Sequence, residues 1–437
     1  MTRVQANAYN IDNMSKNQPT FQIRALGCKV SQYDAAELRR ELESQGFNMG
    51  NDNPSVVIIN TCAVTKAAMK KDRQLARKLR AAHPEALLVV MGCWPQTNEK
   101  LAKAELADDS ILFWGVGRIR ELAELICEKV GKPVVAVKFE SGLVVSSERS
   151  RYILKVGDGC NQFCSYCLIP FARGRLKSRE RSIVLAEAKA AIEAGYDEIV
   201  LSGIHLGLYG TDLAGKYFLK DLLIELLQLS ATTRFRLSSI EVTEVDDDLI
   251  SLITQSDGRI CRHLHISLQS GSDKILSAMK RPYNTEFFLD RLKAIRAAMP
   301  EIGVTTDVIV GFPGETDDDF NDTLSFLKKC NFAGIHVFPF SPHEQTAAFT
   351  LEGRVAPRQI KERALALRRV SEEAAQVYRE GLLKRFAGQK MKLVSEKKGG
   401  EFIKGHSEFY PIFSFPKKLA PGLEAGKMIE VEVRHLS

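Results

Sequence analysis

Strand–helix alternation is the feature of this 437-residue sequence that most restricts its fold. Between residues 21 and 135, apolar runs typical of strands alternate with amphipathic stretches typical of helices. The strand-like runs are FQIRALGC, SVVIINTC, ALLVVMGC and ILFWGVG. Two of them are almost continuously apolar, as in strands that are buried on both faces of a parallel sheet. The pattern predicts βαβ units in a doubly wound parallel sheet, and therefore an α/β fold.

The same alternation continues with longer spacing in the predicted second domain, residues 136–378. Its six strand-like runs are RYILKVGDG, DEIVLSGIH, RFRLSSIE, HLHISLQS, GVTTDVIVG and AGIHVFPFS. Six such units predict a TIM-like, partial (β/α)6 barrel. A long helix is expected over residues 357–386, with Pro357 near its first turn. Short alternating strands after it predict a small all-β domain over residues 379–437.

Composition excludes several classes of protein. The chain has no run of about 18 apolar residues, so no transmembrane helix is expected. Residues 1–20 are polar and predict a disordered tail rather than a signal peptide. Nine cysteines, an odd number in a long α/β-patterned chain, do not indicate a secreted disulfide framework. We therefore expect a protein of the reducing cytoplasm.

The net charge of +7 is concentrated near the C-terminus. Residues 383–437 contain eleven Lys and Arg against six Asp and Glu, a net charge of +5. This excess indicates either contact with nucleic acid or a solvated basic surface. The side chains available for phosphate contacts are Lys384, Arg385, Lys390, Lys392, Lys397, Lys398, Lys417 and Lys418.

Three cysteines crowd into the segment GDGCNQFCSYC, at Cys160, Cys164 and Cys167. A structural zinc site uses four protein ligands, and the following residues LIPFARGR supply no fourth. Thiolate-rich sites suit zinc or iron–sulfur clusters. A cluster held by three thiolates keeps one metal position open for another ligand.

Three further cysteines, Cys28, Cys62 and Cys93, each close a predicted strand of the first domain. The carboxyl ends of parallel strands share one edge of a sheet, where ligands bind. The three thiols are therefore predicted to converge in a second cluster site; the alternative is three buried, apolar cysteines. The remaining cysteines, in apolar or strand-start contexts, are interpreted as ordinary: Cys127, Cys261 and Cys330.

The pattern CxxxCxxC after the first strand of a βα barrel resembles the radical S-adenosylmethionine superfamily. The resemblance implies a [4Fe-4S] cluster on Cys160, Cys164 and Cys167 whose open iron binds the amino and carboxylate groups of S-adenosylmethionine. It also implies reductive cleavage to methionine and a 5′-deoxyadenosyl radical. Tyr166 matches the aromatic residue that packs near the adenine.

Other strand ends provide candidate cofactor contacts. The polar residues of HLHISLQS share one face of the predicted strand, which should point at ligand or at water-filled space; they are His263, His265, Ser267 and Gln269. The turn DVIVGFPGET, in its plainest interpretation a strand–helix turn, resembles the superfamily's adenine-contacting turn, which implies contacts from Ile309 and Gly311. Glu241 closes RLSSIE and is a candidate for a ribose or amino-group contact.

Two three-cysteine sets and a basic terminal β-domain resemble the methylthiotransferases over nearly the whole chain. The motifs LGCKVSQYD, INTCAVT, SGIHLGLYG and HLHISLQSGS resemble the branch that acts on threonylcarbamoyladenosine in tRNA. The resemblance implies two [4Fe-4S] clusters, the second on Cys28, Cys62 and Cys93. It also implies a TRAM-like terminal domain that binds the tRNA anticodon stem-loop. The implied reaction adds a methylthio group to carbon 2 of N6-threonylcarbamoyladenosine at tRNA position 37.

Alternatives to this activity remain. Other branches of the family modify N6-isopentenyladenosine in tRNA or a ribosomal-protein aspartate, and a non-enzymatic iron–sulfur RNA-binding protein is a further alternative. The sequence departs from the family at Ser31 and Ser267, where Asn and Pro are usual. The segment SPHEQTAAF lacks the usual Arg and Gly, so the resemblance implies no substrate contacts for residues 341–348. The expected partners include a reductant such as flavodoxin or ferredoxin, and we expect a monomer.

Overall fold

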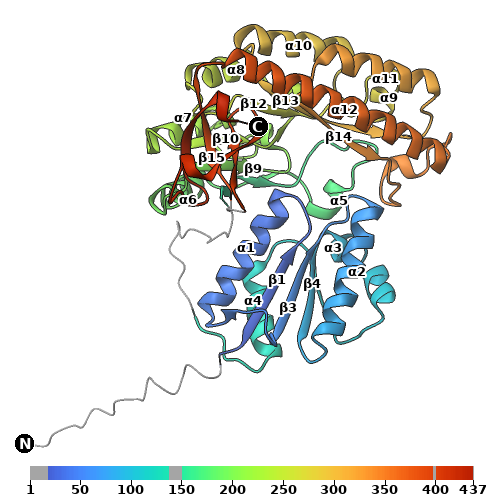
Figure 1. Cartoon of the computed structure of the whole chain (residues 1–437). Coiled ribbons are helices and arrows are strands. Elements are labelled where there is room, and N and C mark those ends of the chain that lie inside the picture. Colours follow the sequence, from blue (N-terminus) through green and yellow to red (C-terminus); the bar gives the residue numbers. More distant parts are fainter. Residues whose placement is uncertain (1–17, 137–149, 397–399, 437) are drawn as a thin grey trace, which may run out of the picture. The chain divides into compact units, whose positions relative to one another are not determined.

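The computed structural model describes residues 18–136, 150–396 and 400–436 (Figure 1). The chain divides into two compact units, residues 1–139 and 140–437. Most of the predicted N-terminal tail lies outside the described residues, and the first strand begins at Thr20.

The first unit contains a five-stranded parallel sheet in the order β2-β1-β3-β4-β5. Its strands are β1 (Thr20–Ala25), β2 (Asn48–Met49), β3 (Val56–Thr61), β4 (Leu87–Gly92) and β5 (Leu112–Trp114). Its helices are α1 (Lys29–Ser44), α2 (Lys66–Ala82), α3 (Cys93–Leu106) and α4 (Ile119–Lys129). Helices α1 and α4 cover one face and α2 and α3 the other, which confirms the predicted doubly wound sheet (Figure 1). The short edge strand β2 was not predicted.

The order of these strands reverses between β1 and β3. In such sheets the ligand crevice lies at the carboxyl ends of the two strands on either side of the reversal. Cys28 directly precedes α1 after β1, and Cys62 directly follows β3. Strand β3 is buried along its whole length because helices cover both faces of the sheet. The buried strand thus fixes where the thiol of Cys62 emerges.

The second unit contains six successive parallel strand segments that curve into an open barrel. They are β6 (Tyr152–Lys155), β9 (Glu198–Ser202), β10 (Arg234–Leu237) with its continuation β11 (Ser239–Ile240), β12 (His263–Ile266), β13 (Gly303–Val310) and β14 (Gly334–Pro339). They form two sheets, β10-β9-β6 and β11-β12-β13-β14, that meet where the run β10–β11 is interrupted at Ser238. The predicted partial barrel is confirmed.

Helices and short elements connect the barrel strands. They are β7 (Gly157–Asp158), α5 (Ile169–Arg173), β8 (Lys177–Ser178), α6 (Arg181–Glu193), η2 (Leu206–Leu208), α7 (Leu219–Leu229), η3 (Val242–Glu244), α8 (Asp247–Gln255), α9 (Asp273–Ala278), α10 (Thr285–Ala298), α11 (Asp317–Cys330) and η4 (Ala347–Phe349). The long helix α12 (Pro357–Arg385) begins with Pro357 in its first turn, as predicted.

Alternation along the barrel strands separates an apolar outer face from a polar inner face. Leu264, Ile266 and Leu268 are buried in the core that the surrounding helices share. The intervening side chains of the same run include Ser267 and Gln269, which line a cavity inside the barrel. The polar face predicted from HLHISLQS therefore points inward.

The chain ends in an antiparallel sheet of order β17-β16-β15-β18, in agreement with the predicted all-β domain. Its elements are β15 (Lys390–Ser395), β16 (Phe402–Ser407), β17 (Ile412–Pro416), η5 (Lys417–Leu419), β18 (Met428–Glu432) and η6 (Val433–His435). Strand β17 was not predicted. Phe409, Phe413 and Phe415 form the centre of a separate apolar core under this sheet.

Buried ion pairs join this sheet to the barrel. Glu198 of β9 is fully buried and accepts hydrogen bonds from Nε of Arg234 and Nε of Arg236, each at 2.7 Å. The same guanidinium groups donate to the carbonyl oxygens of His406 and Ser407, at 2.9 and 2.7 Å. The barrel and the β-domain therefore share one hydrogen-bonded network and belong to one unit.

None of the helices in the described ranges has both the length and the apolar character needed to cross a membrane.

We predict that Glu198→Gln destabilises the second unit by about 3–5 kcal/mol at pH 7, because two guanidinium charges lose their buried partner. Burial by itself would raise the pKa of Glu198, but Arg234 and Arg236 outweigh burial and lower it. The carboxylate of Glu198 therefore makes its full contribution to the free energy of unfolding above its unfolded-state pKa of about 4.3. That contribution is lost as the pH falls through the lower pKa of the folded state. Urea unfolding followed by circular dichroism measures the free energy of unfolding of both proteins. The difference between the wild type and Glu198→Gln should shrink below about pH 4.

The matched control is Glu193→Gln, which removes an exposed carboxylate 3.9 Å from Lys189. This exposed pair should contribute almost nothing to the free energy of unfolding, so the control should have the same unfolding midpoint as the wild type. Equal unfolding midpoints for Glu198→Gln and Glu193→Gln at pH 7 would contradict the role of the network.

Candidate functional site

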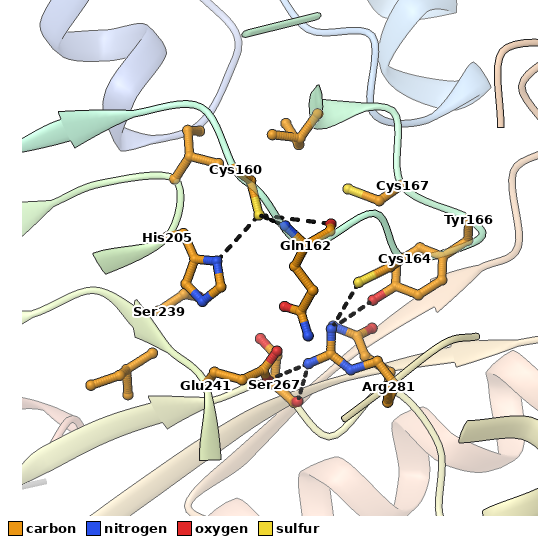
Figure 2. A pocket seen from close by; sticks show the side chains of 14 residues that line it. Cys160, Gln162, Cys164, Tyr166, Cys167, His205, Ser239, Glu241, Ser267 and Arg281 are labelled. Carbon is orange, nitrogen blue, oxygen red and sulfur yellow. Dashed lines mark hydrogen bonds and ion pairs between the residues drawn. The ribbon is translucent and has the colours of Figure 1, made fainter. Parts of the chain in front are cut away.

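The three cysteines of GDGCNQFCSYC lie on the loop between β7 and α5, at one end of the barrel. Figure 2 shows their side chains around a single cavity. Its lining combines this loop with the carboxyl ends of several barrel strands. The lining residues are Cys160, Gln162, Cys164, Tyr166, Cys167, Ile169, Ile204, His205, Ser239, Ile240, Glu241, Ser267, Gln269 and Arg281.

His205 contacts the first sulfur. Its Nδ1 lies 3.2 Å from Cys160 Sγ (Figure 2). Its Nε2 is hydrogen-bonded to the carboxylate of Glu244. Burial by itself would lower the pKa of His205, but the bonds to Cys160 and Glu244 raise it to about 10. When it is protonated, the imidazole donates one N–H to the sulfur and the other to the carboxylate of Glu244.

The turn around Gly207 makes room for this arrangement. A Cβ built at Gly207 would lie 1.9 Å from Oε2 of Glu244, so any larger residue would displace the carboxylate. Glu244 also accepts a hydrogen bond from the backbone N–H of Glu241 at 3.0 Å. The carboxylate is thus fixed from two sides, and it fixes the orientation of the His205 ring.

Arg281 contacts the second sulfur. Its Nη1 donates to Cys164 Sγ at 3.2 Å, and its Nη2 pairs with the carboxylate of Glu241 (Figure 2). Burial raises the pKa of Cys164, and the guanidinium opposes that rise. Arg281 and Glu241 are both almost completely buried, so the pair acts in a low-dielectric setting.

The third sulfur, Cys167, has a more apolar setting. Burial raises the pKa of Cys167 to about 12, while a hydrogen bond from the backbone of Ile169 opposes the rise. The neighbouring Tyr166 packs against an apolar cluster that includes Ile309, Phe312 and Phe340. A thiol in this setting stays protonated near neutral pH unless a metal ion binds the sulfur and the proton is released to solvent.

The structure brings together most of the predicted cofactor contacts. Tyr166, Glu241 and Gln269 line the cavity with the three cysteines. Gln269 has φ +71, an uncommon conformation for a residue with a side chain, and such strain clusters at functional sites. Ile309 packs against the same apolar cluster as Tyr166 but is not among the residues that line the cavity.

Gly311 also lies outside the cavity lining. Its N–H donates to Glu315 Oε2 at 2.7 Å, and a Cβ at this position would meet Ile360 of α12 at 2.3 Å. The glycine therefore permits close packing of α12 against the turn.

The sequence interpretation missed His205, Glu244 and Arg281 as site residues. His205 and Gly207 stand in SGIHLGLYG at the carboxyl end of a predicted strand. Ligands bind at such ends, so the position of His205 could have identified it as a site residue. Arg281 and Glu244 carried no local signal, because their contacts with the site depend on residues about 40 or more positions away.

The second cysteine set lies in the first unit, at the carboxyl edge of its sheet. Cys28 precedes α1, Cys62 follows β3, and Cys93 begins α3. Burial, with smaller contributions from the nearby thiols of Cys93 and Cys28, raises the pKa of Cys62 to about 12. The mutual influence of these thiols agrees with their predicted placement along one sheet edge, and their role as cluster ligands stays a prediction.

Buried polar atoms without partners lie beside this set. Among the described residues, Ser31 Oγ, Asn60 Oδ1 and Asp72 Oδ1 are buried and accept or donate no hydrogen bond. A Cβ built at Gly27 would approach both Ser31 and Cys62, and the N–H of Cys62 donates to Asp72 Oδ2 at 2.9 Å. Buried polar groups are normally satisfied, so these atoms indicate a site built for a polar or metallic group.

Both sets fit iron–sulfur clusters by the chemistry of their donors. Each offers three sulfur atoms, and in the barrel set two of the sulfurs accept hydrogen bonds from cationic side chains. Hydrogen bonds to the sulfurs and burial are the features by which proteins tune such clusters. The remaining cysteines, Cys127, Cys261 and Cys330, are buried in other parts of the fold.

Comparison with protein families matches both units. A model described as the Radical SAM superfamily matches residues 154–327, and one described as Uncharacterized protein family UPF0004 matches residues 20–113. The first range includes the barrel cysteine set and the second includes the sheet-edge set.

Several relatives match most of the chain. A threonylcarbamoyladenosine tRNA methylthiotransferase from Bacillus subtilis is 37% identical over 82% of this chain and 82% of its own length. One from Thermotoga maritima is 35% identical over 96% of this chain and 95% of its own. A tRNA-2-methylthio-N6-dimethylallyladenosine synthase from Carboxydothermus hydrogenoformans is 33% identical over 80% of this chain and 82% of its own length.

Solved structures share the fold. A radical S-adenosylmethionine methyltransferase from Kitasatospora setae, with cobalamin and a [4Fe-4S] cluster bound, has a TM-score of 0.56. It is 16% identical and the match covers 76% of this chain and 77% of that chain. At this identity the likeness concerns the fold alone.

We predict that His205→Ala lowers the reduction potential of the cluster that Cys160, Cys164 and Cys167 fit. Loss of a cationic hydrogen-bond donor to a thiolate favours the oxidised form. A shift of about 60 mV or more is expected, since about 59 mV corresponds to a tenfold change in a one-electron equilibrium. A potentiometric titration followed by electron paramagnetic resonance measures it.

Replacing Cys28, Cys62 and Cys93 by Ala in the same protein removes the signal of the other set. Glu244→Gln serves as the graded control, because it keeps the imidazole but removes the charge behind it. An unchanged potential in His205→Ala would show that the imidazole does not act on the cluster.

Proposed function

The chain belongs to the radical S-adenosylmethionine tRNA methylthiotransferases, and we propose that it methylthiolates carbon 2 of N6-threonylcarbamoyladenosine at tRNA position 37. The observation that carries this proposal is the presence of two separate three-thiol sites, one in each unit. The identity of 35–37% to threonylcarbamoyladenosine enzymes over most of the chain supports the substrate. The C–H bond at carbon 2 is not acidic, so acid–base catalysis has no proton to remove there.

Cys160, Cys164 and Cys167 would hold a [4Fe-4S] cluster together with S-adenosylmethionine, and Cys28, Cys62 and Cys93 would hold a second cluster. When bound, the first cluster supplies the electron for reductive cleavage of S-adenosylmethionine. The chain's own contribution is to desolvate the thiols and to place charge beside them. His205 and Arg281 donate to two of the sulfurs, which disperses the negative charge of the thiolates.

Residues that line the cavity would bind the polar parts of S-adenosylmethionine. Gln269 is buried and strained, with its side chain at the cavity, and Glu241 presents a carboxylate held by Arg281. Tyr166 closes one side with an aromatic ring suited to the adenine. Ile309 and Gly311 do not line the cavity and would act indirectly: Ile309 packs against the same apolar cluster as Tyr166, and Gly311 lets α12 pack closely.

The domain assignment follows from these sites. Residues 21–135 would form the methylthiotransferase domain, residues 136–378 the radical domain and residues 379–437 a TRAM-like domain that binds RNA.

In the antiparallel register, Lys390 lies opposite Glu432 and Lys392 opposite Glu430. These two lysines face acidic neighbours, so the exposed Lys417 and Lys418 are better placed for phosphate contacts.

Further partners follow from the reaction. A one-electron donor such as flavodoxin or ferredoxin would reduce the cluster. The anticodon stem-loop of tRNA would be the macromolecular substrate, and we propose that the protein acts on it in the cytoplasm. We propose that the protein acts as a monomer, since each chain carries both thiol sets.

Complementation of a strain that lacks the gene tests this function. Its tRNA should lose 2-methylthio-N6-threonylcarbamoyladenosine and keep the unmethylthiolated precursor, as measured by mass spectrometry of nucleosides. The wild-type gene should restore the product. Genes in which either cysteine set is replaced by Ala should not, because each set would hold its own cluster.

The two cysteine variants should differ in the isolated protein. The variant without Cys28, Cys62 and Cys93 should still form 5′-deoxyadenosine from S-adenosylmethionine and dithionite, whereas the variant without the barrel set should not. Restoration of 2-methylthio-N6-isopentenyladenosine instead would assign the chain to the other tRNA branch. Full complementation by both cysteine variants would contradict the proposal.

We predict that the double change of Lys417 and Lys418 to Glu weakens binding of the anticodon stem-loop. Each lost phosphate contact should reduce the slope of log affinity against log salt by about 0.7–0.9. Isotherms at several salt concentrations measure the slope. The matched control is the double change of Lys390 and Lys392 to Glu, in which the lysines already face Glu432 and Glu430. A larger effect from the control pair would contradict this surface.

A further inference from the structure

Helix α2 of the first unit carries a large excess of positive charge. Residues 66–82 contain seven Lys and Arg against one Asp, a net charge of +6 in a chain whose total is +7. The one acid, Asp72, is buried and accepts a hydrogen bond from the N–H of Cys62 at 2.9 Å. Its carboxylate therefore leaves the exposed side of the helix without a compensating charge. The terminal β-domain is not the only strongly basic part of the protein.

Three of these cations attach α2 to its neighbour α3. Arg73 pairs with the carboxylate of Glu105, and Nη2 of Arg77 donates to the carbonyl oxygen of the same residue at 2.7 Å. Nε of Arg80 donates to Oδ2 of Asp108, just beyond the end of α3, at 2.8 Å. The positions of these arginines are therefore explained by packing within the unit.

The remaining lysines Lys70, Lys71 and Lys78 have a different setting. All three side chains are exposed, and within the described ranges none of them lies at ion-pair distance from a carboxylate. Helical spacing places them on the side opposite the buried Asp72 and Ala76. We call these three lysines the basic face of α2.

The other helices of the first unit treat their exposed cations differently. Each of α1, α3 and α4 pairs a cation with an acid one turn away; the pairs are Arg39–Glu43, Lys103–Glu99 and Arg120–Glu124, at 2.8, 2.6 and 3.2 Å. Helix α2 has no such pair, because no cation stands three or four residues from Asp72. Instead, Lys66 and Lys70 are four residues apart, and such like-charge spacing lowers helix stability, as does a lysine in the first turn. A surface that carries charge at the expense of its own helix is expected to have an anionic partner.

The basic face begins beside the sheet-edge cysteine set. Cys62 follows β3, and Thr65 caps α2, with its Oγ1 accepting from the N–H of Ala68 at 3.1 Å. From Lys70 to Lys78 the face extends along about 12 Å of helix. The start of the helix adds unpaired N–H groups and the positive end of its dipole, both of which favour phosphate.

We propose that the basic face of α2 binds phosphates of the tRNA anticodon stem-loop. This inference rests on the proposed function. A base that receives a group from the sheet-edge site must approach the edge where α2 begins, so the nucleotides that flank it bring their phosphates to this helix. Phosphates are spaced along an RNA strand, one charge each, which suits lysines spread along a helix. Contacts of this kind position the RNA and do not read its sequence.

An acidic electron-transfer protein is the other class of anionic partner. The proposed function requires its electron at the barrel cysteine set, which belongs to the second unit, whereas α2 belongs to the first. The observations therefore favour RNA as the partner of this surface.

The test measures binding of an anticodon stem-loop that carries threonylcarbamoyladenosine at position 37. The protein is the full chain with both clusters reconstituted. The variant changes Lys70, Lys71 and Lys78 together to Gln, whose helix propensity is close to that of Lys. Near 0.1 M salt the affinity should fall by about tenfold or more. The slope of log affinity against log salt should become shallower by about two units, since each phosphate contact contributes about 0.7–0.9.

Two further variants control for charge and fold. Changing the same three lysines to Arg keeps the charges and should keep the wild-type slope. Changing Lys103, Arg118 and Arg120 to Gln removes three cations of the same unit that already face acids, and it should keep the wild-type affinity and slope. Equal iron content and equal helicity by circular dichroism show an intact fold. If the triple Gln variant loses iron, Lys70→Gln and Lys78→Gln are measured singly, and each slope should fall by about 0.7–0.9.

The outcomes separate this inference from the proposed function. Wild-type affinity and slope in the folded Gln variants of α2 would overturn the inference alone. An equal loss in the control with Lys103, Arg118 and Arg120 changed would reveal a general charge effect and would also overturn it. Unchanged RNA binding with slower cluster reduction by reduced flavodoxin would assign the surface to the electron donor, against the inference. Wild-type protein without affinity for any anticodon stem-loop would overturn the proposed function as well.

Discussion

Parallel pairing of strands is the constraint on which the functional architecture depends. In a parallel sheet every strand delivers its carboxyl end to the same edge, and each βα unit places the next side chain beside the last. Cys28, Cys62 and Cys93 meet at such an edge although about thirty residues separate them. The barrel uses the same geometry to place Glu241, Ser267 and Gln269 around the cysteine loop. Both thiol sites are therefore consequences of one topological rule.

Charge placement around the thiols is the second level of organisation. The sulfurs of the barrel set are desolvated, which by itself disfavours thiolates, as the raised pKa of Cys167 shows. His205 and Arg281 compensate at Cys160 and Cys164, and each cation is held by a carboxylate behind it. A metal cluster bound here would therefore lie in an apolar enclosure with two directed cationic donors. This combination suits a cluster whose charge changes during electron transfer more than structural metal binding.

The terminal β-domain serves the barrel as well as the RNA surface proposed for it. Its backbone carbonyls at His406 and Ser407 accept from the arginines that neutralise Glu198. Its Tyr410 stacks on His263 and forms the floor of the lumen. A truncation that removes this domain would expose the buried ion pairs, so surface substitutions are the cleaner way to separate RNA binding from folding.

The sequence by itself determined the order of strands and helices, both cysteine sets and the inward polar face of HLHISLQS, because these depend on local periodicity and on residue type at strand ends. It missed the short strands β2 and β17, whose few residues carry little periodic signal. Only the tertiary structure decided that Arg281 contacts Cys164, that Glu244 holds His205, and that β12, β13 and β14 bring His265, Asp307 and His336 together. These contacts join residues about 30 to 117 positions apart, and no local pattern encodes which distant side chain will fill a given space. Strand register and packing decide it.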